Sequence, residues 1–379
     1  MFLSHNSIYP IGLDISDSSL KLVQLDKKGN KIKIQAIGKT ELPEGYFMNG
    51  EIVKKDDVVR AIKKLIEKPQ YGKVSSDEVV ACLPETKTFL KFAKIEKSPN
   101  DITHLIEAEL EKNIPMTINE LYYDWQIVKN TRDAQLVLIA AAPRKIVDQY
   151  SKIIEDAGLT LVAFEIEPVA SCRGLLEEES TKYKGGYETN YFIIDIGAAR
   201  TNLLSYSKNT ILFSITIDLS GNDITDEIAR TLEIDLEQAE KAKIICGLDE
   251  DKAQGVVKNI LGKMMDKLTA KILEAQEYQK THFGERGGVD KIYLCGGGAN
   301  IKNLPEIIAE KTKVSTTIGN PIINLSGSRE EFIKIIHEVW EPGSAKKSKK
   351  SKPPTLTQDT PSTFATAIGL GLRNIFLEE

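Results

Sequence analysis

The sequence is poor in cysteine and histidine, with four of each among 379 residues. The cysteines are far apart and form no CxxC pair, and the histidines form no HExxH pattern. Closely spaced cysteines and histidines are the usual mark of disulfide frameworks and zinc sites. Their scarcity argues against both, and it predicts reduced, buried thiols in a reducing compartment. The residues concerned are Cys82, Cys172, Cys246 and Cys295, with His5, His104, His282 and His337.

Long hydrophobic runs and an excess of positive charge are also lacking. Leu136–Ala142 is one of the longest apolar runs, and it is far too short to span a bilayer. Residues 1–10 lack the basic start and apolar stretch of a secretion signal. The net charge of −5 provides no basic field for nucleic acid. We therefore expect no binding of nucleic acid, and membrane association only through a partner or a surface segment.

What the sequence does contain is a polar hairpin at residues 192–207, FIIDIGAARTNLLSYS. An apolar strand leads to Asp195, and a turn with Gly197, Thr201 and Asn202 leads to a second strand. Glycine lets backbone N–H groups approach an anion closely, and a nearby carboxylate can orient a hydrated Mg²⁺. The stretch predicts a phosphate-binding loop. A plain hairpin tip is the alternative interpretation of these residues alone.

Residues 11–25, IGLDISDSSLKLVQL, repeat this layout, with Asp14 in the place of Asp195. The two aspartates lie 181 residues apart, about half the chain. Two halves that begin alike indicate an internal duplication. Two such loops can hold one polyphosphate, which favours the phosphate interpretation.

The remaining periodicity predicts an α/β chain. Between elements of the first half, residues 79–160 form a strand–helix–strand–strand–helix unit. Residues 341–363 have no apolar periodicity and predict disorder. Helices are expected at 56–68, 100–113, 144–157, 167–176, 222–232, 235–245, 256–283, from 305, and at 364–377, where small residues permit close packing.

Two further features are weak alone. Glu240 and Lys243 lie one helical turn apart, so both can face one cleft, although an exposed ion pair is the simpler interpretation. Gly296–Gly298 form a turn after an apolar strand, flat enough to pass beneath a base.

Taken in order, these features resemble the actin-like ATPase superfamily. Asp14 and Asp195 match its two phosphate-loop aspartates, and Gly296–Gly298 match its adenosine motif. Glu240 and Lys243 are similar to the ribose-binding ExxK pair of the heat-shock ATPase chaperones. Glu167, in EIEPVAS, matches an acid near the γ-phosphate.

A closer resemblance, to the PilM family of type IV pilus assembly, covers nearly the whole chain. The segments that carry it include LDISDSSLKLVQL, LIAAAPRKIVDQYSKIIEDAGL, FIIDIGAARTNLL and YLCGGGANIKNL. The family implies an actin-like fold with two lobes, a duplicated core and an FtsA-like 1C insertion at 79–160. The lobes are expected at 1–190 and 191–379, the second with a small helical subdomain at about 222–288.

The family also implies a partner, the short cytoplasmic N-terminal tail of the membrane protein PilN, held in a groove of the first lobe. The resemblance then implies that this protein is cytoplasmic and lies at the inner face of the cytoplasmic membrane, attached through that partner. Pilus ATPases and self-association stay open as further interactions.

The resemblance implies an ATP–Mg²⁺ site, with Asp14 and Asp195 orienting the metal through water and Glu167 as the one catalytic candidate. Hydrolysis is expected to be slow or undetectable. The residues expected to bind the nucleotide are Asp14, Ser16, Ser18, Ser19, Lys21, Asp195, Gly197, Thr201, Asn202, Gly221, Glu240, Lys243, Gly296, Gly297 and Gly298.

The sequence departs from the family pattern in three places. Ser16 stands where the superfamily usually has glycine, which predicts a weaker or reshaped phosphate contact. Arg200 either binds phosphate or only adds charge. The lysine-rich insert at 341–363 is a solubilising linker or a membrane-surface contact.

Two other classes of function stay open. An FtsA-like division filament would usually end in a basic amphipathic helix, whereas this chain ends in RNIFLEE. A small-molecule kinase of the same superfamily would need an acceptor pocket and a substrate acid.

Overall fold

The computed structural model describes residues 8–98, 101–177, 189–327, 329–340 and 360–377, which divide into two compact units. Unit 1 comprises Met1–Glu178, Ile322–Ser351 and Thr366–Glu379. Unit 2 comprises Glu179–Pro321 and Lys352–Ala365. The C-terminal helix thus belongs, from Thr366 on, to unit 1 and not to the second lobe, where the family resemblance implied it.

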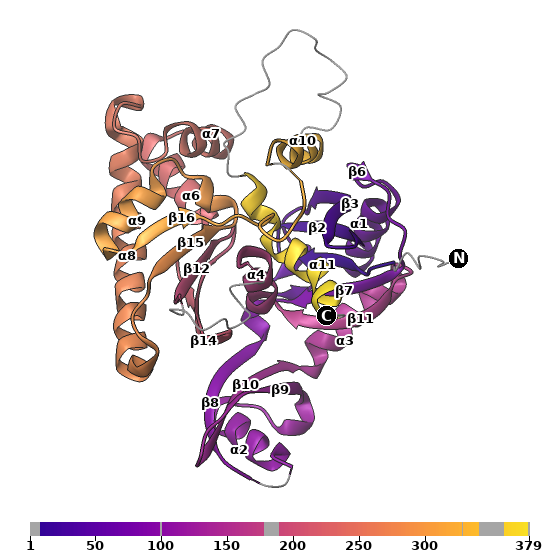
Figure 1. Cartoon of the computed structure of the whole chain (residues 1–379). Helices are drawn as coiled ribbons and strands as arrows, with labels where there is room; N and C mark the ends of the chain where they lie inside the picture. Colours follow the sequence, from indigo (N-terminus) through magenta and orange to yellow (C-terminus); the bar gives the residue numbers. More distant parts are fainter. Residues whose placement is uncertain (1–7, 99–100, 178–188, 328, 341–359, 378–379) are drawn as a thin grey trace. The chain divides into compact units, whose positions relative to one another are not determined.

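Unit 1 is built on a six-stranded sheet of order β11-β7-β1-β2-β3-β6. One face carries a core with α1 (Lys55–Glu67) and α3 (Arg144–Asp156), and the other packs on α4 (Glu167–Leu175) (Figure 1). The strands are β1 (Ile11–Ile15), β2 (Ser19–Lys28), β3 (Lys31–Glu41), β6 (Tyr71–Gly72), β7 (Glu78–Leu83) and β11 (Thr160–Ile166), beside a short hairpin of β4 (Phe47–Met48) and β5 (Glu51–Ile52).

Unit 2 repeats this topology in a five-stranded sheet of order β14-β13-β12-β15-β16. As β1 pairs antiparallel with β2 and parallel with β7, so β12 pairs antiparallel with β13 and parallel with β15. The expected duplication of the core is therefore confirmed. The elements are β12 (Tyr191–Ile196), β13 (Thr201–Ser207), β14 (Thr210–Ile217), β15 (Lys291–Cys295), β16 (Ser315–Ile318), α6 (Gly221–Leu232), α7 (Leu236–Cys246), α8 (Val256–His282) and α9 (Leu304–Thr312).

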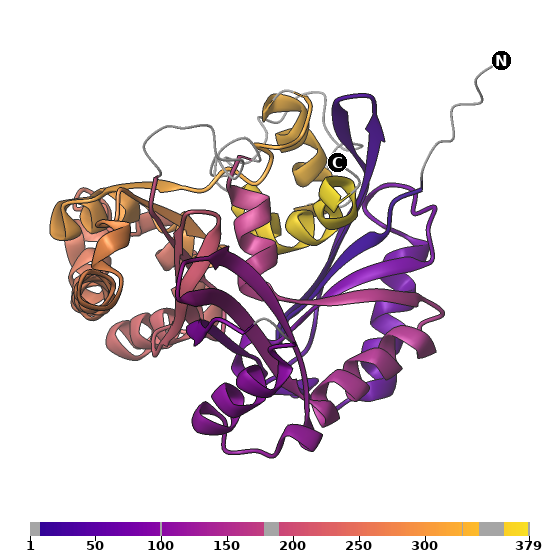
Figure 2. The ribbon, with the colours of Figure 1, turned by 60° about the horizontal axis from the view of Figure 1, so that its bottom comes forward.

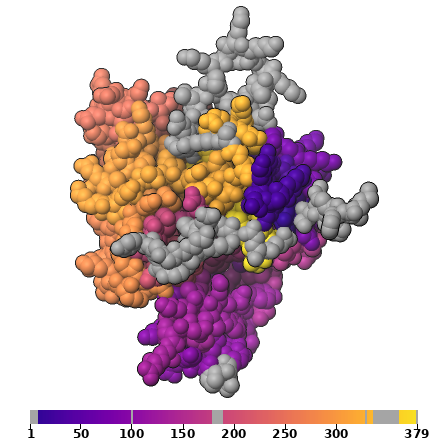
Figure 3. Space-filling view, in the orientation of Figure 1, coloured from indigo at the N-terminus to yellow at the C-terminus, as the bar shows by residue number. Residues whose placement is uncertain are grey.

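An inserted subdomain of unit 1 extends away from the six-stranded sheet (Figures 1 and 3). It is a three-stranded sheet of order β8-β10-β9, with α2 packed on one face around Ile106, Leu110, Val137 and Ile139. Strand alternation directs the half-buried side chains of the other face away from that core. The elements are β8 (Phe89–Glu96), α2 (Thr103–Asn113), β9 (Leu121–Asn130) and β10 (Ala134–Pro143).

The helix α11 (Ala365–Leu377) joins unit 1 because small residues let it approach the sheet and α4 (Figure 2). A Cβ at Gly12 would stand 2.3 Å from the carbonyl oxygen of Ala367, and one at Gly369 would stand 1.8 Å from that of Ala170. Only glycine allows such contacts. The preceding α10 (Arg329–Trp340) packs near β3 and β6.

The predicted disorder over 341–363 can be compared with the structure only at residues 360–363, because residues 341–359 lie outside the described residues. Thr360–Phe364 form a 3₁₀ turn in which Pro361, Ser362 and Phe364 are buried, so disorder was wrong there. The ring of Phe364, the residue just after the segment predicted to be disordered, is fully buried and provides the apolar contact that the segment's own composition lacks. Among the described helices, none combines the length and the apolar character that crossing a membrane requires.

Candidate functional site

The first predicted loop brings Asp14 and Lys21 together in unit 1. They are direct cross-strand neighbours on β1 and β2, and Lys21 Nζ donates to Asp14 Oδ2 at 2.8 Å. Asp14 is 3% exposed, so its carboxylate is held in place with its partner rather than solvated. A paired, hydrogen-bonded carboxylate at the end of a strand is pre-organised for a ligand.

The turn between these strands is closed by the side chain of Ser16. Its backbone N–H and hydroxyl both donate to the carbonyl oxygen of Ser19, at 3.0 and 2.9 Å. The Ser19 N–H donates back to Ser16 Oγ at 3.2 Å. A serine here therefore occupies the Ser19 amide, which a glycine would leave available to an anion. Ser18 fixes the turn to the sheet, since its carbonyl oxygen accepts from Leu42 N–H at 2.8 Å.

A buried thiol, which the sequence analysis did not single out, lies beside Asp14. Cys82 Sγ donates to Asp14 Oδ1 at 3.5 Å. Burial raises the pKa of the Cys82 thiol well above its usual value, and the charges of Asp14 and Glu167 raise it further. Glu167 opens α4 directly after β11, which pairs with β7 up to Ile166 and Leu83. The structure thus places Asp14, Cys82 and Glu167 in one neighbourhood.

The second predicted loop, in unit 2, contains polar atoms without partners. Asp195 lies opposite Asn202 on β13, and the Gly197 N–H closes the turn by donating to the carbonyl oxygen of Arg200 at 2.9 Å. Thr201 Oγ1 and Asn202 Oδ1 are buried and have no hydrogen-bond partner within the described chain. Each such atom costs about 1–3 kcal/mol, so the loop fits a polar ligand.

This loop is tied to the start of α6. The N–H groups of Gly221 and Asn222 donate to the carbonyl oxygens of Gly197 and Ala198, both at 2.9 Å. A Cβ at Gly221 would stand 3.2 Å from the Gly197 oxygen, a tight contact that the glycine avoids. Ser220 caps α6 by accepting from the Asp223 N–H at 3.1 Å.

Glu240 and Lys243 form an ion pair whose lysine is buried. Lys243 Nζ lies 2.7 Å from Glu240 Oε2 and also donates to Gly221 O at 3.0 Å and Thr225 Oγ1 at 2.8 Å. These contacts use all three donors of an ammonium group. Lys243 therefore fastens α7 to α6. Thr225, which sequence reasoning missed, lies one helical turn after Gly221 and contacts Glu240 at 2.6 Å.

The three glycines after β15 meet different demands. A Cβ at Gly296, where φ is +78°, would stand 2.2 Å from Asp195 Oδ1, and one at Gly298 would stand 2.2 Å from Ile196 Cγ2. A Cβ at Gly297 would meet no described atom within 4 Å. Nearby, Asn300 Oδ1 is buried without a hydrogen-bond partner in the described residues. The glycine turn and the Asp195 loop thus form one contiguous cluster in unit 2.

Direct coordination of a metal by the protein is not supported in the described segments. Their His, Cys, Asp and Glu side chains form no group of three or more that would hold a metal ion. Mg²⁺ usually keeps several waters and uses one or two carboxylates together with substrate phosphates. The carboxylates of Asp14 in unit 1 and of Asp195 in unit 2 are each groups of that chemical kind.

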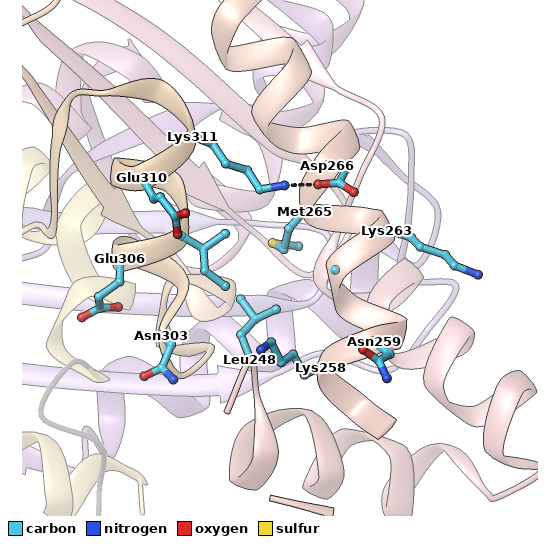
Figure 4. A pocket seen from close by; sticks show the side chains of 12 residues that line it. Leu248, Lys258, Asn259, Lys263, Met265, Asp266, Asn303, Glu306, Glu310 and Lys311 are labelled. Carbon is cyan, nitrogen blue, oxygen red and sulfur yellow. Dashed lines mark hydrogen bonds and ion pairs between the residues drawn. The ribbon is translucent and has the colours of Figure 1, made fainter. Parts of the chain in front are cut away.

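A separate open groove of about 790 Å³ lies between α8 and α9 (Figure 4). Its lining includes Lys258, Lys263, Glu306 and Glu310, and Lys311 pairs with Asp266 across it. None of the residues expected to bind nucleotide lines this groove.

Known proteins place the chain in a family. The profile described as Type IV pilus assembly protein PilM matches residues 12–335. FtsA of Streptococcus pneumoniae is 23% identical over 86% of this chain and 80% of its own length. FtsA of Staphylococcus epidermidis is 27% identical over 62% of this chain, which spans about half (54%) of that relative.

Solved structures agree on the fold. A solved PilM-PilN type IV pilus biogenesis complex matches with a TM-score of 0.77 and 23% identity, covering 97% of this chain and 99% of that one. MreB5 of Spiroplasma citri, solved with ADP, matches with a TM-score of 0.52 and 15% identity over 90% of this chain and 97% of that one. The fold is the expected actin-like ATPase fold. Since the family profile spans most of the sequence, the chain belongs to the PilM family of type IV pilus assembly proteins.

Proposed function

We propose that this protein is an ATP-binding scaffold of the type IV pilus assembly platform, which binds the cytoplasmic N-terminal tail of a PilN-like membrane protein. The observation that carries the proposal is the match of nearly the whole chain to a PilM solved with PilN. The protein would work at the inner face of the cytoplasmic membrane, attached through that partner. Pilus ATPases and further copies of the chain are additional candidate partners.

The open face of the inserted sheet suits the tail. Leu90, Leu136 and Leu138 are half-buried there, on the side away from the core beneath α2. Leu138 lies opposite Phe92 on β8, so apolar side chains gather at the centre of the face. Such a face favours the apolar side chains of an extended peptide.

A synthetic tail peptide tests the partner. We expect Leu138→Lys to weaken peptide binding at least tenfold by calorimetry, because a charge would replace an apolar contact. The control is Ile127→Lys, on the other face of the same sheet and 42% exposed, which should bind normally. If both variants bind the peptide as tightly as the wild type does, the tail does not bind to this face of the inserted sheet.

For the nucleotide, we propose that Asp14 with Lys21 and the Asp195 loop bind the phosphates, and that Mg²⁺ is oriented through water by the two aspartates. In unit 2, Glu240 would accept from the ribose while Gly297 and Gly298 lie against adenine. Support comes from the unpartnered Thr201 and Asn202 atoms and from MreB5, a protein of this fold solved with ADP. Because its donors are all used, Lys243 would position Glu240 rather than contact ribose. When bound, ATP–Mg²⁺ supplies a polyphosphate whose charge the metal partly neutralises.

Turnover is proposed to be slow. Hydrolysis needs a group that positions the attacking water, and Glu167 is the candidate. The neighbouring Cys82 stays protonated at neutral pH because burial raises its pKa, so it offers no base. A rate within the roughly 1–100 s⁻¹ typical of kinases would contradict this proposal.

ATP titration tests the nucleotide site. Asp195→Ala should reduce the affinity at least tenfold while the far-UV spectrum stays native. Asp218→Ala, an exposed acid of the same unit, is the matched control and should bind as the wild type does. Unchanged affinity in Asp195→Ala would remove this residue from the site.

An FtsA-like membrane filament is the second candidate, favoured by the alignment with FtsA over most of the chain. Co-sedimentation of the isolated protein with lipid vesicles would support it. If the purified protein phosphorylates a small hydroxyl compound, it is instead a small-molecule kinase of the same superfamily.

A further inference from the structure

Lys39 on β3 lies directly opposite Lys21 on β2, and Lys21 lies directly opposite Asp14 on β1. The three side chains therefore form one row across three neighbouring strands, on one face of the sheet. This row contains two cations and one carboxylate. It begins at the aspartate of the first loop.

Both lysines are largely withdrawn from solvent. The side chain of Lys21 is 14% exposed and that of Lys39 is 16% exposed. Lys39 pairs with Glu41, whose own side chain is 69% exposed, while the buried carboxylate of Asp14 pairs with Lys21. Burial lowers the pKa of Lys39, the attraction of Glu41 offsets part of this shift, and the positive charge of Lys21 makes a smaller contribution that lowers the pKa.

Like charges directly opposite each other on a sheet destabilise it. Partial desolvation makes the arrangement worse, since a cation withdrawn from water needs an anionic partner. Lys21 pairs with Asp14 and Lys39 pairs with the exposed Glu41, so the row itself holds two partly buried cations and one buried carboxylate. An anion at the end of this row would relieve the repulsion between the two lysines.

We propose that Lys39 is a second phosphate-binding cation, which acts with Lys21 on the phosphate groups of the bound nucleotide. This inference rests on the proposed nucleotide function and deepens it. The chemistry that the row recognises is a multiply charged phosphate chain, carried either by a nucleotide or by free polyphosphate. Two ammonium groups suit it because each is a compact point charge with three donors.

The first test compares Lys39→Met with Lys33→Met, an exposed lysine of the same strand. Without ligand, Lys39→Met should unfold at the same or a higher temperature than the wild type, because the repulsion between two partly buried lysines is gone. Its affinity for ATP, or for inorganic tripolyphosphate, should fall at least tenfold. Lys33→Met should change neither quantity, and Lys39→Arg should keep most of the affinity.

A second variant acts in the opposite direction. Glu41→Gln removes the competing carboxylate from Lys39 and, being exposed, should leave the fold intact. We expect ATP affinity to rise severalfold. A purely structural ion pair between Lys39 and Glu41 predicts no change in affinity and a lower unfolding temperature in both variants, and that result would overturn the inference.

The two levels of the proposal fail differently. If the wild type binds neither ATP nor tripolyphosphate, the nucleotide function and the role of Lys39 fall together. If the wild type binds ATP, Asp195→Ala abolishes binding and Lys39→Met binds normally, only the role of Lys39 is overturned. If Lys39→Met loses the binding of tripolyphosphate, the row recognises the phosphate chain alone. If the variant loses the binding of ATP but still binds tripolyphosphate, the row acts on the nucleotide.

Discussion

The carboxylate of Asp195 lies against the Cα of Gly296, so closely that a Cβ on the glycine would stand 2.2 Å from Oδ1 of the aspartate. The two residues belong to neighbouring parallel strands or their ends, since Asp195 pairs with Cys295. The glycine turn therefore does more than offer a flat surface. It makes room for the acid of the preceding loop.

Gly296→Ala should destabilise the protein and displace Asp195. The residue has φ +78° and ψ 177°, a conformation reserved for glycine, where other residues cost about 1–3 kcal/mol. The clash with Asp195 adds to this cost. Urea unfolding measures the loss of stability, and calorimetry with ATP should show weaker binding.

Gly297→Ala is the matched control for the fold, because no described atom would lie within 4 Å of its new Cβ. Its stability should stay within about 0.5 kcal/mol of the wild type, as for ordinary surface changes. If adenine lies against this residue, ATP affinity should nevertheless fall. Full stability with full ATP affinity would contradict the assignment of the base to Gly297.

Variants of Lys243 and Glu240 should differ in what they change, the first lowering the stability of the fold and the second weakening the binding of ATP. Lys243→Met removes a buried ammonium with three partners, and each polar group left unsatisfied costs about 1–3 kcal/mol. Glu240 is 46% exposed, so Glu240→Gln should unfold almost as the wild type does while ATP binding weakens. Denaturant curves and ATP titrations of both variants check this. A stable Lys243→Met variant that has lost ATP binding would instead make the lysine a direct ligand.

Glu165 should be a strong determinant of the stability of unit 1. It receives two bonds from Arg173, at 2.6 and 2.8 Å, and one from Arg373 on α11 at 3.0 Å. Breaking a fully buried pair from one side costs about 3–5 kcal/mol, and this pair keeps a little solvent contact, with 10% of the Glu165 side chain and 18% of the Arg173 side chain exposed. Glu165→Ala should therefore lower the free energy of unfolding by an amount near the lower end of that range. Arg373→Met should cost less, because Arg373 is 28% exposed and makes one of the three bonds.

Much of the fold was predictable because its signals are local. The helices α1, α3, α4 and α8 begin and end within about two residues of the predicted bounds, since apolar spacing and flanking proline or glycine mark them. The duplication was readable from the two aspartate hairpins. Close packing of the C-terminal helix was also predicted correctly from its small residues, and the short approach at Gly369 confirms it.

What the sequence hid depends on tertiary contacts. The short strand β16 and the helix α10 were not predicted. The placement of α11 in unit 1 follows from Gly12, far away in the sequence, which leaves room for Ala367 and Gly371. Cys82 and Thr225 reach the site through strand pairing and one helical turn, for which the motifs give no signal. Their positions needed the register of β7 and the path of α6.

Acid should weaken the attachment of α1 to α3. Asp156 on α3 receives bonds from Lys55 and Lys152, at 2.7 and 2.9 Å, which lower its pKa to about 2. The unfolded chain has the usual value of about 3.9, so below it the unfolded state binds more protons. The contribution of Asp156 is therefore fully present above about pH 4 and is lost as the pH falls toward 2.

The variant Asp156→Asn measures the contribution of the Asp156 carboxylate to stability. At pH 6 the variant should be slightly less stable than the wild type, and the difference should shrink between pH 4 and pH 2.5 in urea unfolding curves. Asp148→Asn, another acid of α3, serves as the control, because its carboxylate meets the hydroxyl of Tyr122 at 3.4 Å rather than a lysine pair. Since the Asp156 contacts are at the surface, salt should reduce the difference at pH 6 as well. A difference between Asp156→Asn and the wild type that stays constant down to pH 2.5 would mean that the two lysines do not hold the carboxylate in its charged form.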